Sequence, residues 1–113
     1  MRGLLIWAVF VMSISCQKVD LKEDTPDCIE RKIIEFKSDN STCESGKQVH
    51  RYIFQGEYVY VFSPGNCGAD MLANVYNEDC VLICSLGGIA GNTTCNEEEF
   101  STNATNETLI WEN

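Results

Sequence analysis

The amino-acid sequence predicts an α+β fold, in which one N-terminal helix packs on a four- to five-stranded antiparallel sheet stapled by disulfides. One stretch of apolar residues repeats with the period of a helix, and the runs that follow it alternate with a period of two. Turn-forming residues separate these runs. The 113 residues also include seven cysteines, a high count that favours covalent cross-links in a small domain. We therefore expect a single folded domain over residues 26–113.

Residues 1–15 have the features of a cleaved signal peptide. Arg2 supplies a positive charge, and the apolar run that follows is too short for a bilayer core, which needs ~20 residues. The next four residues, Ser13-Ile14-Ser15-Cys16, resemble the lipobox of bacterial lipoproteins, although a serine stands three places before the cysteine, where leucine is usual. That resemblance implies a lipid on Cys16, which would anchor the chain to a membrane. Ordinary secretion without a lipid and an uncleaved anchor are the alternatives.

A helix is expected directly after a polar spacer. Residues 16–25 combine the lipidated cysteine with a flexible tether of low apolar content. Thr25 is expected to cap the helix, with Pro26 in its first position. Apolar residues then fall on one helical face at i, i+4 and i+7. These core residues are Ile29, Ile33 and Phe36.

Four strands are expected to form a meander after this helix. Alternation predicts a hairpin over residues 48–62, with its connection at 55–57. Residues 71–76 and 80–85 predict the next two strands, separated by a turn. Residues 109–111 are expected to add a short last strand, and residues 96–108 to form a polar, acidic loop.

Aromatic side chains concentrate on the predicted hairpin. Because strand side chains alternate between the two faces of a sheet, half of these aromatics are expected in the core. If one face stays exposed, it is the candidate surface for a protein, peptide or glycan partner. The residues of this possible binding face are Tyr52, Phe54, Tyr58 and Tyr60.

Six cysteines remain once Cys16 is assigned to a lipid, and an even number favours disulfides in an exported chain. These six are Cys28, Cys43, Cys67, Cys80, Cys84 and Cys95. About fifteen pairings are possible. The spacing excludes only Cys80 with Cys84, because on one strand their Cα atoms would lie ~13 Å apart. The chain has no C-x-x-C motif, which disfavours a metal or redox site.

No combination of residues in the sequence points to catalysis, a metal or a cofactor. His50 is the only histidine, and no nucleophile motif accompanies it. Gly87-Gly88-Ile89-Ala90-Gly91 lacks the spacing of a phosphate loop, so we interpret it as a loop that needs positive φ angles. The acidic runs 77–79 and 97–99 do not match a calcium loop. We expect a domain that is not an enzyme; a small enzyme or an inhibitor-type module is the alternative.

The charge balance disfavours nucleic acid as a partner. The formal net charge is −9, and without Arg2 the mature chain would carry 17 acidic and 7 basic residues, a net charge of −10. Such a surface repels phosphate backbones. Four N-x-[ST] sequons leave a third alternative open, a eukaryotic secreted cysteine-rich glycoprotein. The sequons begin at Asn40, Asn92, Asn103 and Asn106.

Several short motifs stand in a distinctive order along the chain. They are Cys28-Ile29, Gly56-Glu57-Tyr58-Val59-Tyr60, Cys67 before Ala69-Asp70, Ile83-Cys84, Gly87-Gly88-Ile89-Ala90-Gly91, Cys95 and Ile110-Trp111. Together they resemble a domain family of unknown function found in short Bacteroidota lipoproteins. The resemblance implies an α+β cell-envelope lipoprotein and brings no known activity. We therefore expect an exported protein of the outer membrane, with a binding or structural domain.

Overall fold

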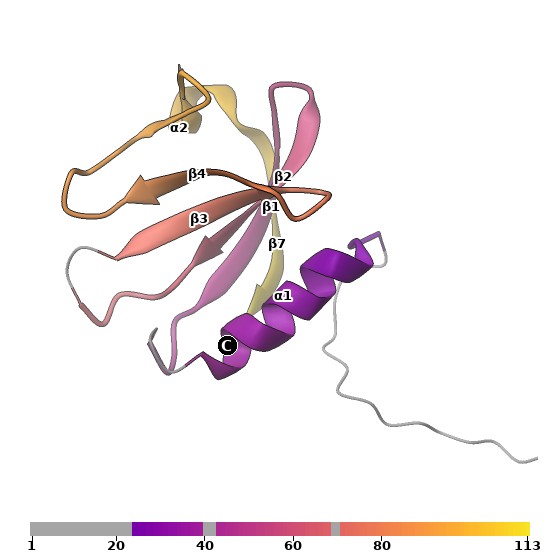
Figure 1. Ribbon diagram of the computed structural model, residues 1–113, viewed down its shortest axis with the longest axis vertical. Coiled ribbons are helices and arrows are strands. Elements are labelled where there is room, and N and C mark those ends of the chain that lie inside the picture. Colours follow the sequence, from indigo (N-terminus) through magenta and orange to yellow (C-terminus); the bar gives the residue numbers. More distant parts are fainter. Residues whose placement is uncertain (1–23, 40–42, 69–70) are drawn as a thin grey trace, which may run out of the picture.

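A computed structural model describes residues 24–39, 43–68 and 71–113 (Figure 1). The elements follow in this order: α1 (Asp27–Ser38), β1 (Gln48–Phe54), β2 (Glu57–Ser63), β3 (Leu72–Asn77), β4 (Leu82–Gly87), β5 (Thr94–Cys95), β6 (Glu98–Glu99), α2 (Phe100–Asn103) and β7 (Thr105–Glu112). The predicted α+β class is confirmed, with α1 packed on a five-stranded antiparallel sheet. The predicted signal peptide, Cys16, most of the tether and Asn40 lie outside the described residues.

Helix α1 begins after Pro26, whose extended backbone at φ −61° and ψ 147° makes it the N-cap residue. The Pro26 carbonyl accepts hydrogen bonds from the backbone N–H groups of Ile29 and Glu30, both at 3.0 Å. The prediction that Thr25 caps the helix is wrong, because the helix starts one residue later than expected. The buried Thr25 hydroxyl hydrogen-bonds to none of the described residues.

The five strands stand in the order β4-β3-β2-β1-β7, and every neighbouring pair is antiparallel. β1 and β2 form the predicted hairpin, with Phe54 opposite Glu57. Only Gln55 and Gly56 connect these strands, at φ 53° and 80°. Two successive positive φ angles give the tight turn whose twist matches that of a hairpin. β1 also pairs with β7, so the last strand of the chain lies beside the first.

Each face of the sheet is partly covered and has its own core (Figure 1). On one face, α1 packs against β1, β2 and β7, and the predicted apolar face of the helix is confirmed. The buried residues of this core are Ile29, Ile33, Val49, Tyr60, Phe62 and Ile110, with Phe36 packed against them. The buried residues of the second core are Phe54, Val59, Val61, Val75, Cys95 and Phe100.

The segment that covers the second face, residues 94–103, corrects the prediction of a polar loop over residues 96–108. It contains β5, β6 and α2, and the strand after it, β7, is eight residues long. Phe100 is only 7% exposed and packs against Phe54, with ring centroids 4.9 Å apart. A single aromatic residue in a polar stretch has no period, so sequence periodicity could not reveal these elements.

Three disulfides join the six cysteines of the described residues, in agreement with the prediction. The pairs are Cys28–Cys80, Cys43–Cys67 and Cys84–Cys95, with Cα–Cα distances of 6.2, 5.6 and 5.3 Å. They tie α1 to the β3–β4 turn, the loop before β1 to the loop after β2, and β4 to β5. Cys80 does not pair with Cys84, as expected, but it lies in a turn at φ 64° and not on β4.

Candidate functional site

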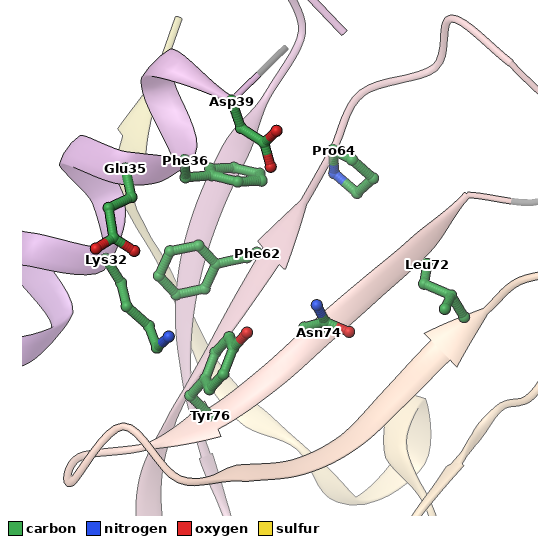
Figure 2. A pocket seen from close by; sticks show the side chains of 9 residues that line it. All are labelled: Lys32, Glu35, Phe36, Asp39, Phe62, Pro64, Leu72, Asn74 and Tyr76. Atoms are coloured by element: carbon green, nitrogen blue, oxygen red, sulfur yellow. The ribbon is translucent and has the colours of Figure 1, made fainter. Parts of the chain in front are cut away.

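A groove of about 280 Å³ lies between the C-terminal half of α1 and strand β3 (Figure 2). It exists because α1 packs on β1, β2 and β7 and leaves parts of β3 and β4 uncovered on that face. Leu72 of β3, for example, remains 49% exposed. The residues that line the groove are Lys32, Glu35, Phe36, Asp39, Phe62, Pro64, Leu72, Asn74 and Tyr76.

Three aromatic rings form the floor of the groove. Phe62 lies between the other two, with its ring centroid 5.2 Å from that of Phe36 and 5.3 Å from that of Tyr76. Both contacts are edge-to-face, at interplanar angles of 77° and 86°, an arrangement that the ring quadrupoles favour. Because the rings come from α1, β2 and β3, the floor is assembled only when the helix docks on the sheet.

Strand β3 presents an amide and a hydroxyl to the groove. The Ser85 hydroxyl donates a hydrogen bond of 2.7 Å to Asn74 Oδ1, and this bond orients the amide with Nδ2 toward the groove (Figure 2). The Tyr76 hydroxyl points into the same space (Figure 2). Neither Asn74 Nδ2 nor the Tyr76 hydroxyl hydrogen-bonds to a described residue, so both donors are available to a ligand.

Charged side chains of α1 line the other rim of the groove. Lys32 Nζ lies 4.4 Å from the centroid of the Tyr76 ring, in a cation–π contact. Glu35 and Asp39 bring carboxylates to the same rim (Figure 2). The rim therefore carries charges of both signs.

The four aromatic residues predicted as a possible binding face do not share one exposed surface. Phe54 and Tyr60 are 1% and 0% exposed and belong to different cores. Tyr52 is half-buried beside Phe100, at 5.1 Å between ring centroids. Tyr58 is 38% exposed, with the Arg51 guanidinium 4.5 Å from its ring centroid. The condition for that binding face, an exposed aromatic side of the hairpin, is not met, because α1 covers part of one side and residues 94–103 cover part of the other.

His50 lies on the face of the sheet opposite the groove. Its Nε2 atom is 3.6 Å from Glu107 Oε2, and the Tyr52 hydroxyl donates a 3.2 Å hydrogen bond to the same carboxylate. Burial, together with the nearby Glu107 charge and the hydrogen bond to that carboxylate, raises the pKa of Tyr52 to about 12. The contacts of His50 and Tyr52 with Glu107 therefore link β1 to β7. They lie on the face opposite the groove, so His50 is not near the groove residues.

Lys47 is a buried charge that the sequence analysis missed. It is 2% exposed, and its Nζ donates to the backbone carbonyls of Phe36, Lys37 and Asp39 at 2.7, 3.3 and 3.2 Å. All three ammonium donors thus bind the C-terminal end of α1, where the helix dipole is negative. A lysine directly before an apolar strand is a weak signal, since most lysines are exposed.

The glycine run and one of the acidic runs noted in the sequence form turns and loops of the fold. Gly87, Gly88 and Gly91 have φ angles of 87°, 77° and 63°, which confirms the prediction of a loop with positive φ angles. Asn77 Oδ1 accepts hydrogen bonds from the backbone N–H groups of Asp79 and Val81. The acidic run 77–79 therefore forms a turn that the Asn77 side chain stabilises. The described residues contain no group of three or more His, Cys, Asp and Glu residues placed to hold a metal ion.

The groove residues of β3 were also missed by the sequence analysis. Asn74 stands between Leu72 and Tyr76 on one face of the strand, and an amide among apolar neighbours is the only signal of this site in the sequence. The residue pattern of α1 and that of β3 do not indicate that these two elements approach each other in space.

The three disulfides indicate an exported protein, because such bonds persist in oxidising compartments. Among the residues that the structure describes, no helix is long and apolar enough to cross a membrane. Residues 35–113 match a family described as a domain of unknown function, DUF6970, and the match includes every groove residue except Lys32. No curated protein and no solved structure matches the chain.

Proposed function

Since the chain belongs to the DUF6970 family, a domain family of unknown function, we propose a function from its own residues. It is a cell-envelope lipoprotein of the Bacteroidota type, anchored in the outer membrane through a lipid on Cys16. Its folded domain is not an enzyme and binds a ligand in the groove between α1 and β3.

The pairing of the cysteines carries the proposal of a lipid anchor. Three disulfides use six of the seven cysteines, so Cys16 has no cysteine left to pair with inside the chain. An unpaired cysteine in an exported chain has another covalent use or a reactive thiol. Cys16 directly follows an apolar stretch and a small residue, Ser15, which supports lipidation as that use.

The position of the groove relative to the tether supports a role in binding. Asp24 lies just before α1, and Arg51 Nη1 of β1 donates a 2.8 Å hydrogen bond to its Oδ2, so the chain enters the domain beside β1 at the start of α1. The helix then runs for about 18 Å at 1.5 Å per residue. The groove lies beside its C-terminal half. A chain tethered at one end of α1 thus keeps the groove at the other end accessible.

The chemistry of the groove favours binding over catalysis. It offers an ammonium, two carboxylates, an amide and a phenol around an apolar floor. Ligand sites have this composition, with a few polar groups that orient a molecule over apolar side chains. The six cysteines of the described chain are paired, and His50 lies on the opposite face of the sheet.

The anchor is tested by the substitution Cys16→Ala in the full chain, expressed in a bacterium that processes lipoproteins. We expect the variant to leave the membrane fraction or to accumulate as uncleaved precursor, because the thiol that accepts the lipid is gone. Membrane fractionation and labelling with radioactive palmitate measure the two effects.

The matched control is Lys22→Ala, which changes the spacer and keeps Cys16. This variant is expected to stay in the membrane fraction and to incorporate palmitate. A Cys16→Ala chain that pellets with membranes at unchanged size would rule out the anchor.

A further inference from the structure

We infer that the groove between α1 and β3 is a saccharide-binding site that takes one or two uncharged sugar rings. This inference rests on the proposed binding function and names the chemical class of the ligand. Three features of the groove lead to it: the aromatic floor, the mixture of hydrogen-bond donors and acceptors, and the presence of both signs of charge on one rim.

The floor of the groove suits a small molecule that has an apolar face. Phe36 and Tyr76 provide partly exposed ring surface there, packed around the buried Phe62, and the volume of about 280 Å³ is near the lower end for small-molecule sites. A pyranose ring presents C–H groups on its faces, and these groups are attracted to the negative faces of aromatic rings. A sugar ring can therefore cover the apolar floor and exclude water from it.

The polar groups of the groove match the hydroxyls of a sugar. Each hydroxyl is both a donor and an acceptor. Asn74 Nδ2 and the Tyr76 hydroxyl make no hydrogen bond to a described residue and can donate to sugar oxygens. The carboxylate of Glu35 on the opposite rim can accept from sugar hydroxyls. The Ser85 hydroxyl holds the Asn74 amide in the donating orientation before any ligand arrives.

The charges around the groove favour a neutral ligand. Lys32 and the two carboxylates, Glu35 and Asp39, stand on the same rim, so neither an anion nor a cation meets one uniform sign of charge. An anionic ligand is also opposed by the net charge of −9. A basic peptide would place its charge next to Lys32, which already lies over the Tyr76 ring.

Binding is measured with the lipidated full chain in detergent. The probes are uncharged tetrasaccharides of glucose, galactose, mannose, xylose and N-acetylglucosamine. A uronic-acid tetrasaccharide and a lysine-rich peptide serve as charged comparisons. Calorimetry measures affinity. Trp111 fluorescence gives a second readout, because its ring lies 6.2 Å from that of Phe36. We expect saturable binding of at least one neutral probe, with the same affinity at about 50 and about 500 mM NaCl.

The variants Tyr76→Phe and Asn74→Ala locate the site. Each removes one donor and is expected to lower the affinity for the neutral probe about fivefold to tenfold, which is the effect of one lost hydrogen bond. Tyr76→Phe keeps the ring of the floor, so its fold is expected to be unchanged by circular dichroism. Tyr52→Phe is the matched control, since it removes a phenol hydroxyl on the opposite face. It is expected to bind like the unaltered chain.

Three results would overturn the saccharide inference. They are no saturable binding of any neutral probe, equal affinity of Tyr76→Phe and the unaltered chain, and salt-sensitive binding of the peptide or the uronic acid alone. In the last case, a loss of that binding in Tyr76→Phe would keep the groove as a binding site and change only its ligand. The proposed anchor is judged separately, by the Cys16→Ala fractionation.

Discussion

Lys47 holds the end of α1 where two parts of the chain meet. Its ammonium binds three backbone carbonyls at the C-terminus of the helix. Its backbone exchanges hydrogen bonds with Asn113, at 3.1 Å to the side-chain carbonyl and 3.1 Å from the backbone N–H. Since Phe36 and Asp39 of this helix end also line the groove, one buried side chain supports both the fold and the candidate site.

Replacing Lys47 with methionine is expected to lower the free energy of unfolding by about 2–4 kcal/mol. The apolar stem fits the same space, but three carbonyls lose a charged donor in a buried position. Urea unfolding with the disulfides intact measures the effect. Lys37→Met, an exposed lysine in the last turn of the same helix, is the control and is expected to change stability by less than about 0.5 kcal/mol. Equal midpoints for the two variants would contradict this role of Lys47.

The elements with a clear period were predicted, and those without one were not. Helix α1 and the β1–β2 hairpin have apolar residues at regular spacing, because each buries one face against a neighbour. The β5, β6 and α2 elements are two to four residues long, too short to show a period. Their position depends on the Cys84–Cys95 disulfide and on Phe100, which are tertiary contacts.

Replacing Phe100 with alanine is expected to lower the free energy of unfolding by about 3–4 kcal/mol, because the ring fills the second core beside Phe54. Denaturant unfolding of the disulfide-bonded chain measures this loss. Ile89→Ala, at a side chain that is 85% exposed, is the control, with an expected change within about 0.5 kcal/mol. A Phe100→Ala chain as stable as the control would mean that residues 94–103 do not cover the sheet.

At the scale of the whole molecule, the disulfides connect the layers of the fold. One bond joins α1 to the turn after β3, and another joins β4 to the segment on the opposite face. The sequence predicted six paired cysteines from their even number. It did not choose among the pairings, because the pairing follows from which cysteines the folded chain brings together.

Peptide mapping of the non-reduced mature protein is expected to give three linked pairs, Cys28–Cys80, Cys43–Cys67 and Cys84–Cys95. Mass spectrometry identifies each linked peptide, and a thiol assay of the denatured chain is expected to find none of these six cysteines free. The reduced and alkylated protein is the control for peptide identity. A peptide that links Cys16 to one of the six would contradict both this pairing and the lipid anchor.

The sequence by itself determined the α+β class, the helix, the hairpin and the presence of disulfides, because these depend on local periods and on composition. Only the tertiary structure decided the cysteine pairing, the burial of Phe54 and Tyr60, and the groove between α1 and β3. The reason is physical. An alternating strand reveals that it has two faces, but what covers each face is decided by segments distant in the chain. Here α1 covers part of one face and residues 94–103 cover part of the other, and the part of β3 that α1 leaves uncovered forms the candidate site.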